Sequence, residues 1–239
     1  MNYFYCENPT ESPHLSSEES QHCIKVLRKK KGDQIELIDG KGSIFKCELV
    51  DENFRKSSFK VLSSEKQNPR SFKIHIAIAP TKNLDRIEWF VEKCCELGVD
   101  EISLVQTKRT ERTRVKIERL DKKAISALKQ SKNFFRCQVN ELISLKNYLN
   151  QEFDQDQKFI AAVDKENPYH LFESYSSAKS VHVLIGPEGD FTNEELGLAQ
   201  SVGFKKVSLG NSTLRTETAG VIAGQILTLK NELDNSNSL

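Results

Sequence analysis

The sequence predicts an α/β protein with a mainly parallel sheet and helices on its faces, preceded by a small β-rich domain. From residue 74 onward, apolar runs of strand length alternate with amphipathic helical patterns, which is typical of a parallel sheet. Before that point, short strand-like runs are separated by polar turns, which favours a β-rich domain. A polar, proline-containing stretch over 63–71 reads as a linker, so we expect domains at 1–70 and 71–239.

The N-terminal domain is predicted from three short runs rich in strand-forming residues: Ile35–Leu37, Ile44–Leu49 and Phe59–Leu62. The dipeptide Asp39-Gly40 separates the first two runs, and the polar stretch 51–58 separates the last two. Strands this short, joined by turns, predict one small sheet.

The C-terminal domain is predicted to begin with a strand over Ile74–Ala79. An amphipathic helix over Ile87–Leu97 follows and stops at Gly98, which suits the position just after a helix end. Further strands are expected at Ile102–Val105 and Phe159–Val163. Strand and helix patterns then alternate to the end of the chain.

The segment Val181–Leu196 reads VHVLIGPEGDFTNEEL and predicts a strand, a glycine-containing turn and a helix. Glycines 186 and 189 can adopt a positive φ and let a ligand approach the backbone. Thr192 and Glu195 have the spacing of a capping box, so we expect the helix to begin there. Taken alone, this segment is also compatible with an ordinary strand–turn–helix connection.

The segment Val207–Ala223, VSLGNSTLRTETAGVIA, repeats the same order of strand end, glycine-containing loop and helix start. We expect Thr216 to cap the helix, with Arg215 beside the helix N-terminus, where a phosphate or a base oxygen could bind. Two such loops at neighbouring strand ends predict one pocket for a small cofactor. The helix carries an apolar stripe that suits core or dimer packing: Ala219, Ile222, Ala223, Ile226, Leu229 and Leu233.

The charge balance excludes a molecule that is basic overall, because the formal net charge of the 239 residues is only +1. Any nucleic-acid surface must therefore come from local clusters of cations. One candidate cluster lies in the N-terminal domain, and the other follows the strand at residue 102. The candidate RNA-binding residues are Lys25, Arg28, Lys29, Lys30, Lys31, Arg109 and Arg112.

The cysteines and histidines do not indicate a metal site. The six cysteines show no C-x-x-C pair, and the five histidines have no ligand spacing, so we predict no metal and expect reduced, structural thiols. The sequence also shows no signal peptide and no apolar run long enough to span a bilayer. These observations predict a cytoplasmic protein without membrane partners.

Three segments, GPEGDFTNEEL, LGNSTLRTETAG and KNLDRIEWFVEKCCELGVDEISLVQTKRT, together resemble the RsmE family of the SPOUT superfamily. The segment HCIKVLRKKKGDQIELIDGKG resembles the family's small PUA-like RNA-binding β-barrel. The resemblance covers essentially the whole chain. It implies a SPOUT-type parallel sheet with a deep C-terminal trefoil knot. It also implies a homodimer that uses S-adenosylmethionine to methylate N3 of a uridine in 16S ribosomal RNA, with an assembled small subunit as the partner.

The same resemblance implies the residues of the site. Arg215 would stabilise negative charge that develops on the uracil carbonyls. Glu217 is a candidate acceptor for the N3 proton, but a carboxylate at a helix N-terminus tends to stay ionised and is a weak base, so solvent is the alternative. The residues expected to bind the cofactor are Leu184, Ile185, Gly186, Pro187, Glu188, Gly189, Leu209, Gly210, Leu214, Thr216 and Thr218.

The sequence departs from the family pattern in the loop after Gly210. The family often has an arginine in this loop, where this chain has Asn211, Ser212 and Thr213. Two alternative functions are compatible with parts of this pattern. A 2′-O-ribose methyltransferase of the same superfamily usually has an asparagine-containing motif in place of Thr-Glu-Thr-Ala, so the motif here favours base methylation. A non-catalytic RNA-binding protein with a vestigial cofactor site is disfavoured by the intact glycines and by Arg215.

Overall fold

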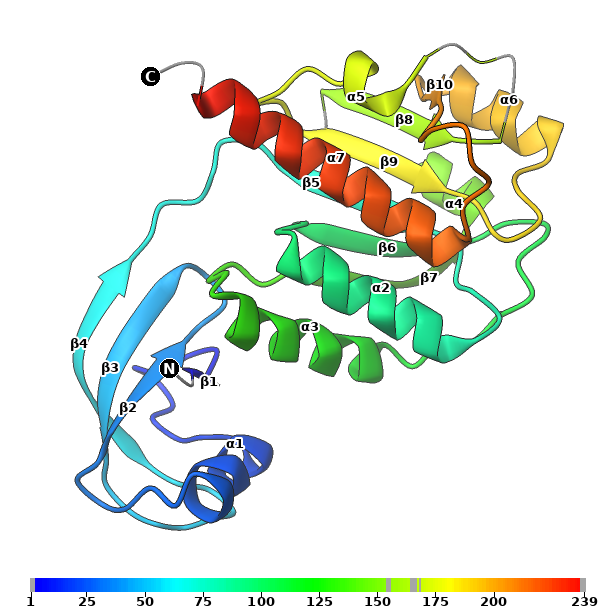
Figure 1. The fold of residues 1–239 in the computed structure, drawn as a ribbon. Helices are drawn as coiled ribbons and strands as arrows, with labels where there is room; N and C mark the ends of the chain where they lie inside the picture. Colours follow the sequence, from blue (N-terminus) through cyan, green and yellow to red (C-terminus); the bar gives the residue numbers. More distant parts are fainter. Residues whose placement is uncertain (1–2, 154–155, 164–166, 168, 237–239) are drawn as a thin grey trace. The chain divides into compact units, whose positions relative to one another are not determined.

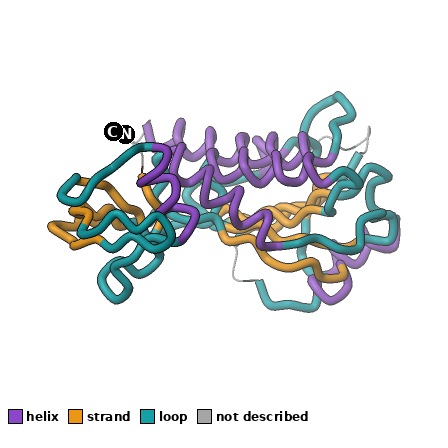
Figure 2. The backbone as a smooth tube through the Cα atoms, turned by 90° about the horizontal axis from the view of Figure 1, so that it is seen from below, coloured by secondary structure: helices purple, strands orange, loops and turns teal. Residues whose placement is uncertain are grey.

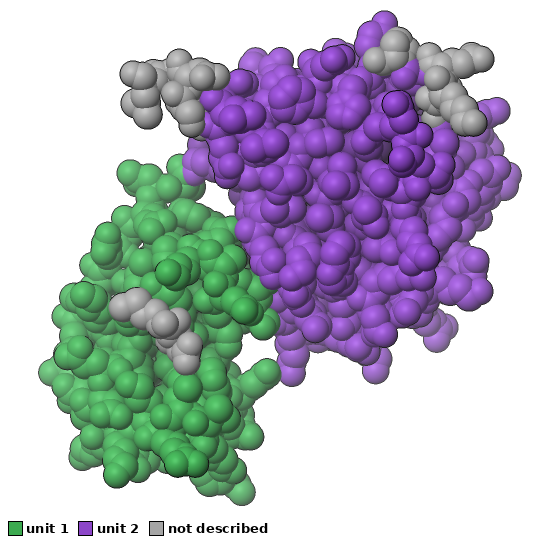
Figure 3. Space-filling view, in the orientation of Figure 1, with its two compact units in different colours: residues 1–69, 125–136 green, residues 70–124, 137–239 purple. Residues whose placement is uncertain are grey.

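The computed structural model describes residues 3–153, 156–163, 167 and 169–236. The chain forms two compact units (Figure 3). The N-terminal unit comprises residues 1–69 with 125–136, and the C-terminal unit comprises 70–124 with 137–239. The predicted division at residue 70 does not include the return of 125–136 to the N-terminal unit. Helix α3 (Ile117–Ser131) therefore contributes residues to both units.

The N-terminal unit contains a four-stranded mixed sheet in the order β1–β2–β3–β4 (Figure 1). Strand β1 (Tyr3–Tyr5) is parallel to β2 (Gln34–Ile38), whereas β3 (Ser43–Leu49) is antiparallel to both β2 and β4 (Phe59–Lys66). The three predicted strands are thus confirmed. The predicted linker is wrong at its start, because residues 63–66 continue β4 by pairing with β3.

Helix α1 (Ser17–Gln21) and the π-helical turn η1 (His22–Val26) cover the core of this sheet. Apolar side chains that alternate along β2 and β3 point into that core, as the two-residue period of a strand requires. The core comprises Phe4, Leu15, Cys23, Ile35, Leu37, Cys47, Leu49 and Phe59.

The C-terminal unit is built on a six-stranded sheet in which every neighbouring pair is parallel, in the order β10–β8–β9–β5–β6–β7. This confirms the predicted α/β class. In the two central strands every residue is buried, because parallel sheets are covered by helices on both faces. The strands are β5 (Ile74–Ile78), β6 (Glu101–Gln106), β7 (Gln138–Ser144), β8 (Gln157–Ala161), β9 (Val181–Ile185) and β10 (Lys205–Val207).

Helices α2 (Leu84–Glu96) and α7 (Thr216–Ser236) run side by side along one face of this sheet (Figures 1 and 2). They approach closely because α7 has Gly220 at the crossing, where a Cβ atom would collide with the ring of Phe90. Helices α4 (Leu145–Leu149) and α6 (Asn193–Ser201) pack on the opposite face, and α5 (Leu171–Ser174) is a single turn. No helix in the described part of the chain combines the length and apolar character that crossing a bilayer requires.

The helix ends follow the local sequence. Helix α2 begins three residues earlier than predicted because Asn83 caps it, and it ends as expected before Gly98, whose φ is 78°. The amides of Gly98 and Val99 donate to the carbonyls of Cys95 and Cys94, which completes a Schellman motif. The capping box of Thr192 and Glu195 is confirmed at the start of α6.

The predicted cap of the last helix is wrong by one residue. The carbonyl of Arg215 accepts the amide of Ala219 at 2.8 Å, so Arg215 occupies the capping position and Thr216 is the first helical residue. The sequence favours Thr216 as the cap, because threonine is a common capping residue and arginine is not.

Two histidines form a buried polar pair inside the sheet. His75 on β5 and His182 on β9 are paired in register, and their ring centroids are 4.3 Å apart in a stacked arrangement. The hydroxyl of Tyr148 lies 2.7 Å from Nε2 of His182 and 3.2 Å from Nε2 of His75. Burial, together with the nearby His75 and Lys158, lowers the pKa of His182 well below its usual range. Both histidine side chains are buried.

The low pKa of His182 makes folding stability depend on pH. Below about pH 6.5 the unfolded chain binds a proton at this position and the folded chain does not. The free energy of unfolding should therefore fall as the pH drops below 6.5, by up to about 1.4 kcal/mol per pH unit from this group. Urea unfolding between pH 7.5 and 5 measures the slope, which should be shallower in His182→Phe, where Tyr148 keeps its contact with His75. Equal slopes in the two proteins would contradict this assignment.

Candidate functional site

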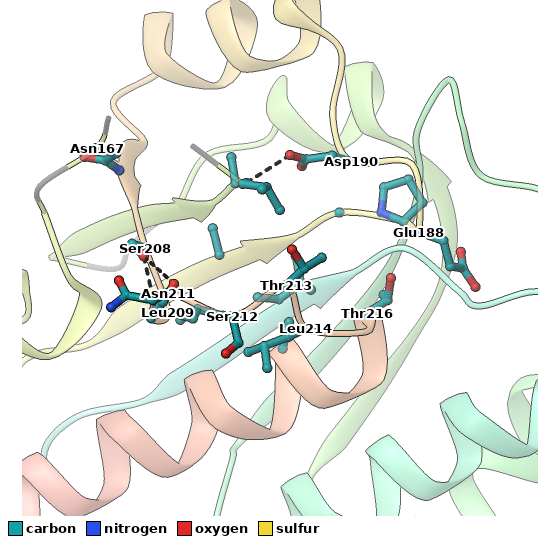
Figure 4. Close-up of a pocket in the computed structure, with 18 residues that line it drawn as sticks. Asn167, Glu188, Asp190, Ser208, Leu209, Asn211, Ser212, Thr213, Leu214 and Thr216 are labelled. Atoms are coloured by element: carbon teal, nitrogen blue, oxygen red, sulfur yellow. Dashed lines mark hydrogen bonds between the residues drawn. The ribbon is translucent and has the colours of Figure 1, made fainter. Parts of the chain in front are cut away.

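A cavity of about 370 Å³ opens at the carboxyl ends of three neighbouring strands (Figure 4). Its wall is formed by residues 161–163 after β8, by 185–188 with Asp190 after β9, and by 208–214 after β10. Asn167, Thr216 and Ala219 complete the lining. In parallel sheets, ligands bind outside the carboxyl ends of the strands, so this is the expected place for a site.

The structure brings together most of the residues that were predicted to bind a cofactor. Those that line the cavity are Ile185, Gly186, Pro187, Glu188, Leu209, Gly210, Leu214 and Thr216. Three predicted residues lie outside the lining. Leu184 is buried in the core against α4 and α6, Gly189 packs against Arg109, and Thr218 is half-buried in the first turn of α7. Contact of any of these residues with a cofactor stays a prediction.

The sequence did not predict the part of the cavity wall formed by residues 161–163. Residues 161–163 belong to it because β8 lies between β9 and β10 in the sheet, and the sequence did not reveal that strand order. The other cavity residues that were not predicted are Asn167, Asp190, Ser208, Asn211, Ser212, Thr213 and Ala219. Five of these, Asp190, Asn211, Ser212, Thr213 and Ala219, lie within the two predicted motifs themselves, and Ser208 directly precedes the second motif.

The loop after β9 does not use its glycines as expected. Neither Gly186 nor Gly189 has a positive φ, and the left-handed residue is Asp190, with φ 59°. A Cβ atom at Gly186 would come within 3.0 Å of the Phe191 ring, so that glycine permits close packing. Asp190 accepts the amide of Val163 at 2.9 Å and thereby ties this loop to the wall after β8 (Figure 4).

The loop after β10 does require a glycine for its conformation. Gly210 has φ 127°, and a Cβ atom there would meet nothing within 4 Å. The hydroxyl of Ser208 accepts the amide of Gly210 and donates to its carbonyl, both at 3.1 Å, which holds the turn (Figure 4). Arg215 is exposed and stands between Leu214 and Thr216, two residues of the cavity wall.

The carboxylate of Glu217 lies outside the cavity wall. It is buried in the first turn of α7, and its Oε1 is 3.8 Å from Nε of Arg86 on α2. Its Oε2 is buried without a hydrogen-bond partner among the described residues. The structure therefore pairs this carboxylate with a neighbouring helix. Within the described chain, no three His, Cys, Asp or Glu side chains are grouped as metal ligands would be.

The two basic clusters differ in how their side chains are engaged. Most cations over 25–31 are exposed, and the Lys25 ammonium lies 3.9 Å from the centroid of the Phe54 ring. In the second cluster, the guanidinium of Arg109 donates to the carbonyl of Gly189. Nε of Arg112 lies 3.1 Å from the carbonyl oxygens of both Thr81 and Lys82. Arg109 and Arg112 are thus bound to loops of their own unit.

The sequence of this chain matches two known protein families. Residues 67–228 match the RNA methyltransferase domain family, and residues 15–62 match the RNA methyltransferase PUA domain. Because the first match covers more than half of the chain, this protein belongs to the RNA methyltransferase domain family.

Proteins and solved structures similar to this chain indicate which group of RNA methyltransferases it resembles. Ribosomal RNA small subunit methyltransferase E of Rickettsia conorii is 29% identical over 211 residues, covering 87% of this chain and 86% of the relative. A probable rRNA methyltransferase from Porphyromonas gingivalis has 36% identity and a TM-score of 0.91, covering 98% of this chain and 100% of that one. Ribosomal RNA small subunit methyltransferase E from Neisseria gonorrhoeae, solved with S-adenosyl methionine bound, has 25% identity and a TM-score of 0.81, covering 94% and 95%. The predicted resemblance to the RsmE family is confirmed.

Substitution of Gly210 tests whether the loop after β10 binds the cofactor. Valine disfavours a φ of 127°, so Gly210→Val should distort the cavity wall and lose most of the affinity for S-adenosylmethionine while the fold is retained. Isothermal titration calorimetry measures the affinity. Gly32→Val is the matched control, because Gly32 also has a positive φ in open space but lies in the N-terminal unit. Unchanged affinity in Gly210→Val would remove this loop from the site.

Proposed function

We propose that this protein methylates N3 of a uridine in 16S ribosomal RNA of the small subunit, with S-adenosylmethionine as methyl donor. The observation that carries the proposal is the cavity formed by the GPEG and LRTETA loops, within a chain that matches the RNA methyltransferase domain. The names of the relatives support the substrate, and the Neisseria gonorrhoeae structure with S-adenosyl methionine bound supports the donor.

The cavity wall suits a molecule with both an apolar base and polar groups. Ile185, Leu209 and Leu214 provide apolar contacts, and Asp190, Ser208 and Asn211 place polar groups on the same wall. When bound, S-adenosylmethionine supplies a methyl group that is already electrophilic. The protein then has to align the uridine and exclude water rather than activate the donor.

The uridine needs help because its N3 carries a proton and is a poor nucleophile until that proton leaves. Arg215 is exposed beside the wall, so its guanidinium can meet RNA at the mouth of the cavity and stabilise charge on the uracil carbonyls. Glu217 is a less suitable proton acceptor than its sequence position indicated, because its carboxylate is buried against Arg86. Solvent is the proton acceptor in this proposal.

The N-terminal unit is the proposed RNA-binding module. Its match to the RNA methyltransferase PUA domain supports this role, and closure of its mixed sheet into a PUA-like β-barrel is part of the proposal. The cations that we propose to contact RNA phosphates are Lys25, Arg28, Lys29, Lys30 and Lys31. For Arg109 and Arg112, whose guanidinium groups also donate to backbone carbonyls, contact with RNA stays a prediction.

The path of the last segment supports the proposed trefoil knot. The chain leaves the edge strand β10, forms the cavity loop 208–214, and returns as α7 to pack beside α2. It therefore passes the loops that follow β8 and β9 before it enters the last helix. A deep knot would hold these loops together around the methyl donor.

The last helix also supports the proposed homodimer. Ile222, Ile226, Leu229 and Leu233 are spaced as one stripe of α7, and Leu229 and Leu233 are 40% and 49% exposed. An apolar stripe at helical spacing whose last two residues are exposed fits the same stripe of a second copy. A cytoplasmic location, where ribosomal RNA is available, completes the proposal.

The Arg215→Ala variant tests the proposed reaction. Loss of one preorganised charge-stabilising donor should reduce the single-turnover rate of 16S methylation by about a hundredfold to a thousandfold, with little change in substrate binding. Arg215→Lys should recover little of the rate, because a point charge cannot reproduce the planar fork. Raising the pH should partly rescue the alanine variant, since more uracil is then deprotonated. A variant that loses RNA affinity but keeps its single-turnover rate would show that Arg215 only docks the RNA. A wild-type enzyme that forms no 3-methyluridine would refute the function.

The Leu229→Glu and Leu233→Glu double variant tests the dimer. The wild type should be a dimer by light scattering at micromolar concentration, and the double variant should be a monomer because the charges oppose burial of the stripe. The control is Leu62→Glu, which changes a leucine that is 46% exposed in the N-terminal unit and should leave the dimer intact. A monomeric wild type with full activity would contradict the prediction.

A further inference from the structure

The segment 107–112, which follows β6, lies at the same edge of the sheet as the cavity and is held firmly in place. We call residues 107–112 the brace. The hydroxyls of Thr107 and Thr110 are 2.9 Å apart and buried, so they fix the turn of the brace. The amide of Lys108 donates to Glu195 at 2.7 Å, which attaches the brace to the start of α6. Its side chains therefore start from an ordered backbone.

The brace holds two loops. Arg112 donates to the carbonyls of Thr81 and Lys82 in the loop after β5, with both Nε distances at 3.1 Å. Arg109 donates to the carbonyl of Gly189 in the loop after β9. The Gly189 carbonyl lies between Glu188 and Asp190, which both line the cavity. The contact made by Arg109 thus reaches the backbone of the cavity wall.

The absence of a side chain at Gly189 leaves space for the side chain of Arg109. A Cβ atom at residue 189 would lie 3.1 Å from Cδ of Arg109, a tight contact that would displace the arginine side chain slightly, and 3.5 Å from its Cβ, an ordinary van der Waals contact. The backbone of Gly189 has no positive φ, so its conformation does not require glycine. Residue 189 is also outside the cavity lining. The contact with Arg109 is a physical reason for a glycine at this position.

The two held loops are also joined to each other. The amide of Lys82 donates to Oε1 of Glu188 at 3.3 Å, and the carbonyl of the same lysine accepts from Arg112. Movement of either loop would therefore break contacts of the other. The guanidinium groups of Arg109 and Arg112 therefore donate to backbone carbonyls of the protein itself. The basic pattern of the sequence predicted RNA contacts for the same two residues.

We propose that Arg109 positions the methyl-donor loop by holding the Gly189 carbonyl, and that residue 189 is a glycine to admit Arg109. The pairing of the two residues follows from their contact, whereas its effect on the methyl donor rests on the proposed function. Arg109 is a positioning residue here, because it acts through the backbone of residues 188–190.

A double-mutant cycle tests the proposal. Arg109→Ala and Gly189→Ala should each raise the dissociation constant of S-adenosylmethionine about three- to tenfold, as expected when a charge-assisted hydrogen bond is lost. Gly189→Ala made in the Arg109→Ala background should add less than about twofold, because the new methyl group then meets no side chain. Calorimetry on the four proteins measures the coupling.

Further variants separate positioning from a general loss of structure. Arg109→Lys should recover part of the affinity, since an ammonium can still donate to the carbonyl. The KM for S-adenosylmethionine should rise in Arg109→Ala, while the single-turnover rate at saturating donor stays near that of the wild type. Arg114→Ala, an exposed arginine on the loop after the brace, should leave donor affinity unchanged. So should Gly197→Ala, where a Cβ atom meets nothing within 4 Å.

Two results would overturn the proposal. One is additive effects of Arg109→Ala and Gly189→Ala on donor affinity. The other is unchanged donor affinity in Arg109→Ala, with the log–log salt slope of RNA binding reduced by about 0.7 to 0.9, which would show a phosphate contact. A wild-type protein that binds no S-adenosylmethionine would refute the proposed function instead. In that event the thermal midpoints of the same four proteins would still show whether Arg109 and Gly189 are coupled.

Discussion

The parallel direction of all six strands in the C-terminal sheet is the constraint on which the candidate site depends. Because each strand must be reached by a crossover, the loops that follow the strands gather at one edge of the sheet. The loops after β8, β9 and β10 meet there and form the cavity. The loops after β5 and β6 lie at the same edge, and they contact the cavity loop after β9 at Glu188 and Gly189. Residues far apart in the sequence therefore share one site.

The cavity loops are held in place by polar contacts within and between them. Asp190 binds the amide of Val163, Arg109 binds the carbonyl of Gly189, and Ser208 bonds both backbone groups of Gly210. Each contact satisfies a backbone group that the irregular conformation would otherwise leave to water. A wall built in this way is organised before a ligand arrives, which lowers the entropic cost of binding.

The sequence predicted the features that depend on a few adjacent residues. The capping box at Thr192, the glycine end of α2 and the buried strands β5 and β9 all follow from local patterns. It did not predict the order β10–β8–β9–β5, which depends on packing between distant elements, so the wall at 161–163 was missed. The polar composition of residues 63–66 predicts a linker, but these residues form a strand because they pair with β3.

The glycines of the two motifs occupy their positions for different physical reasons, and not all of these reasons concern a ligand. Gly210 is favoured by its φ of 127°, whereas Gly186 gives room to the ring of Phe191 and Gly189 to the side chain of Arg109. Only the first of these supports the idea that the backbone itself is shaped around the cavity. The other two glycines make room for side chains that shape or support the wall. A shared sequence pattern therefore combines separate physical requirements, and only the contacts of each residue tell them apart.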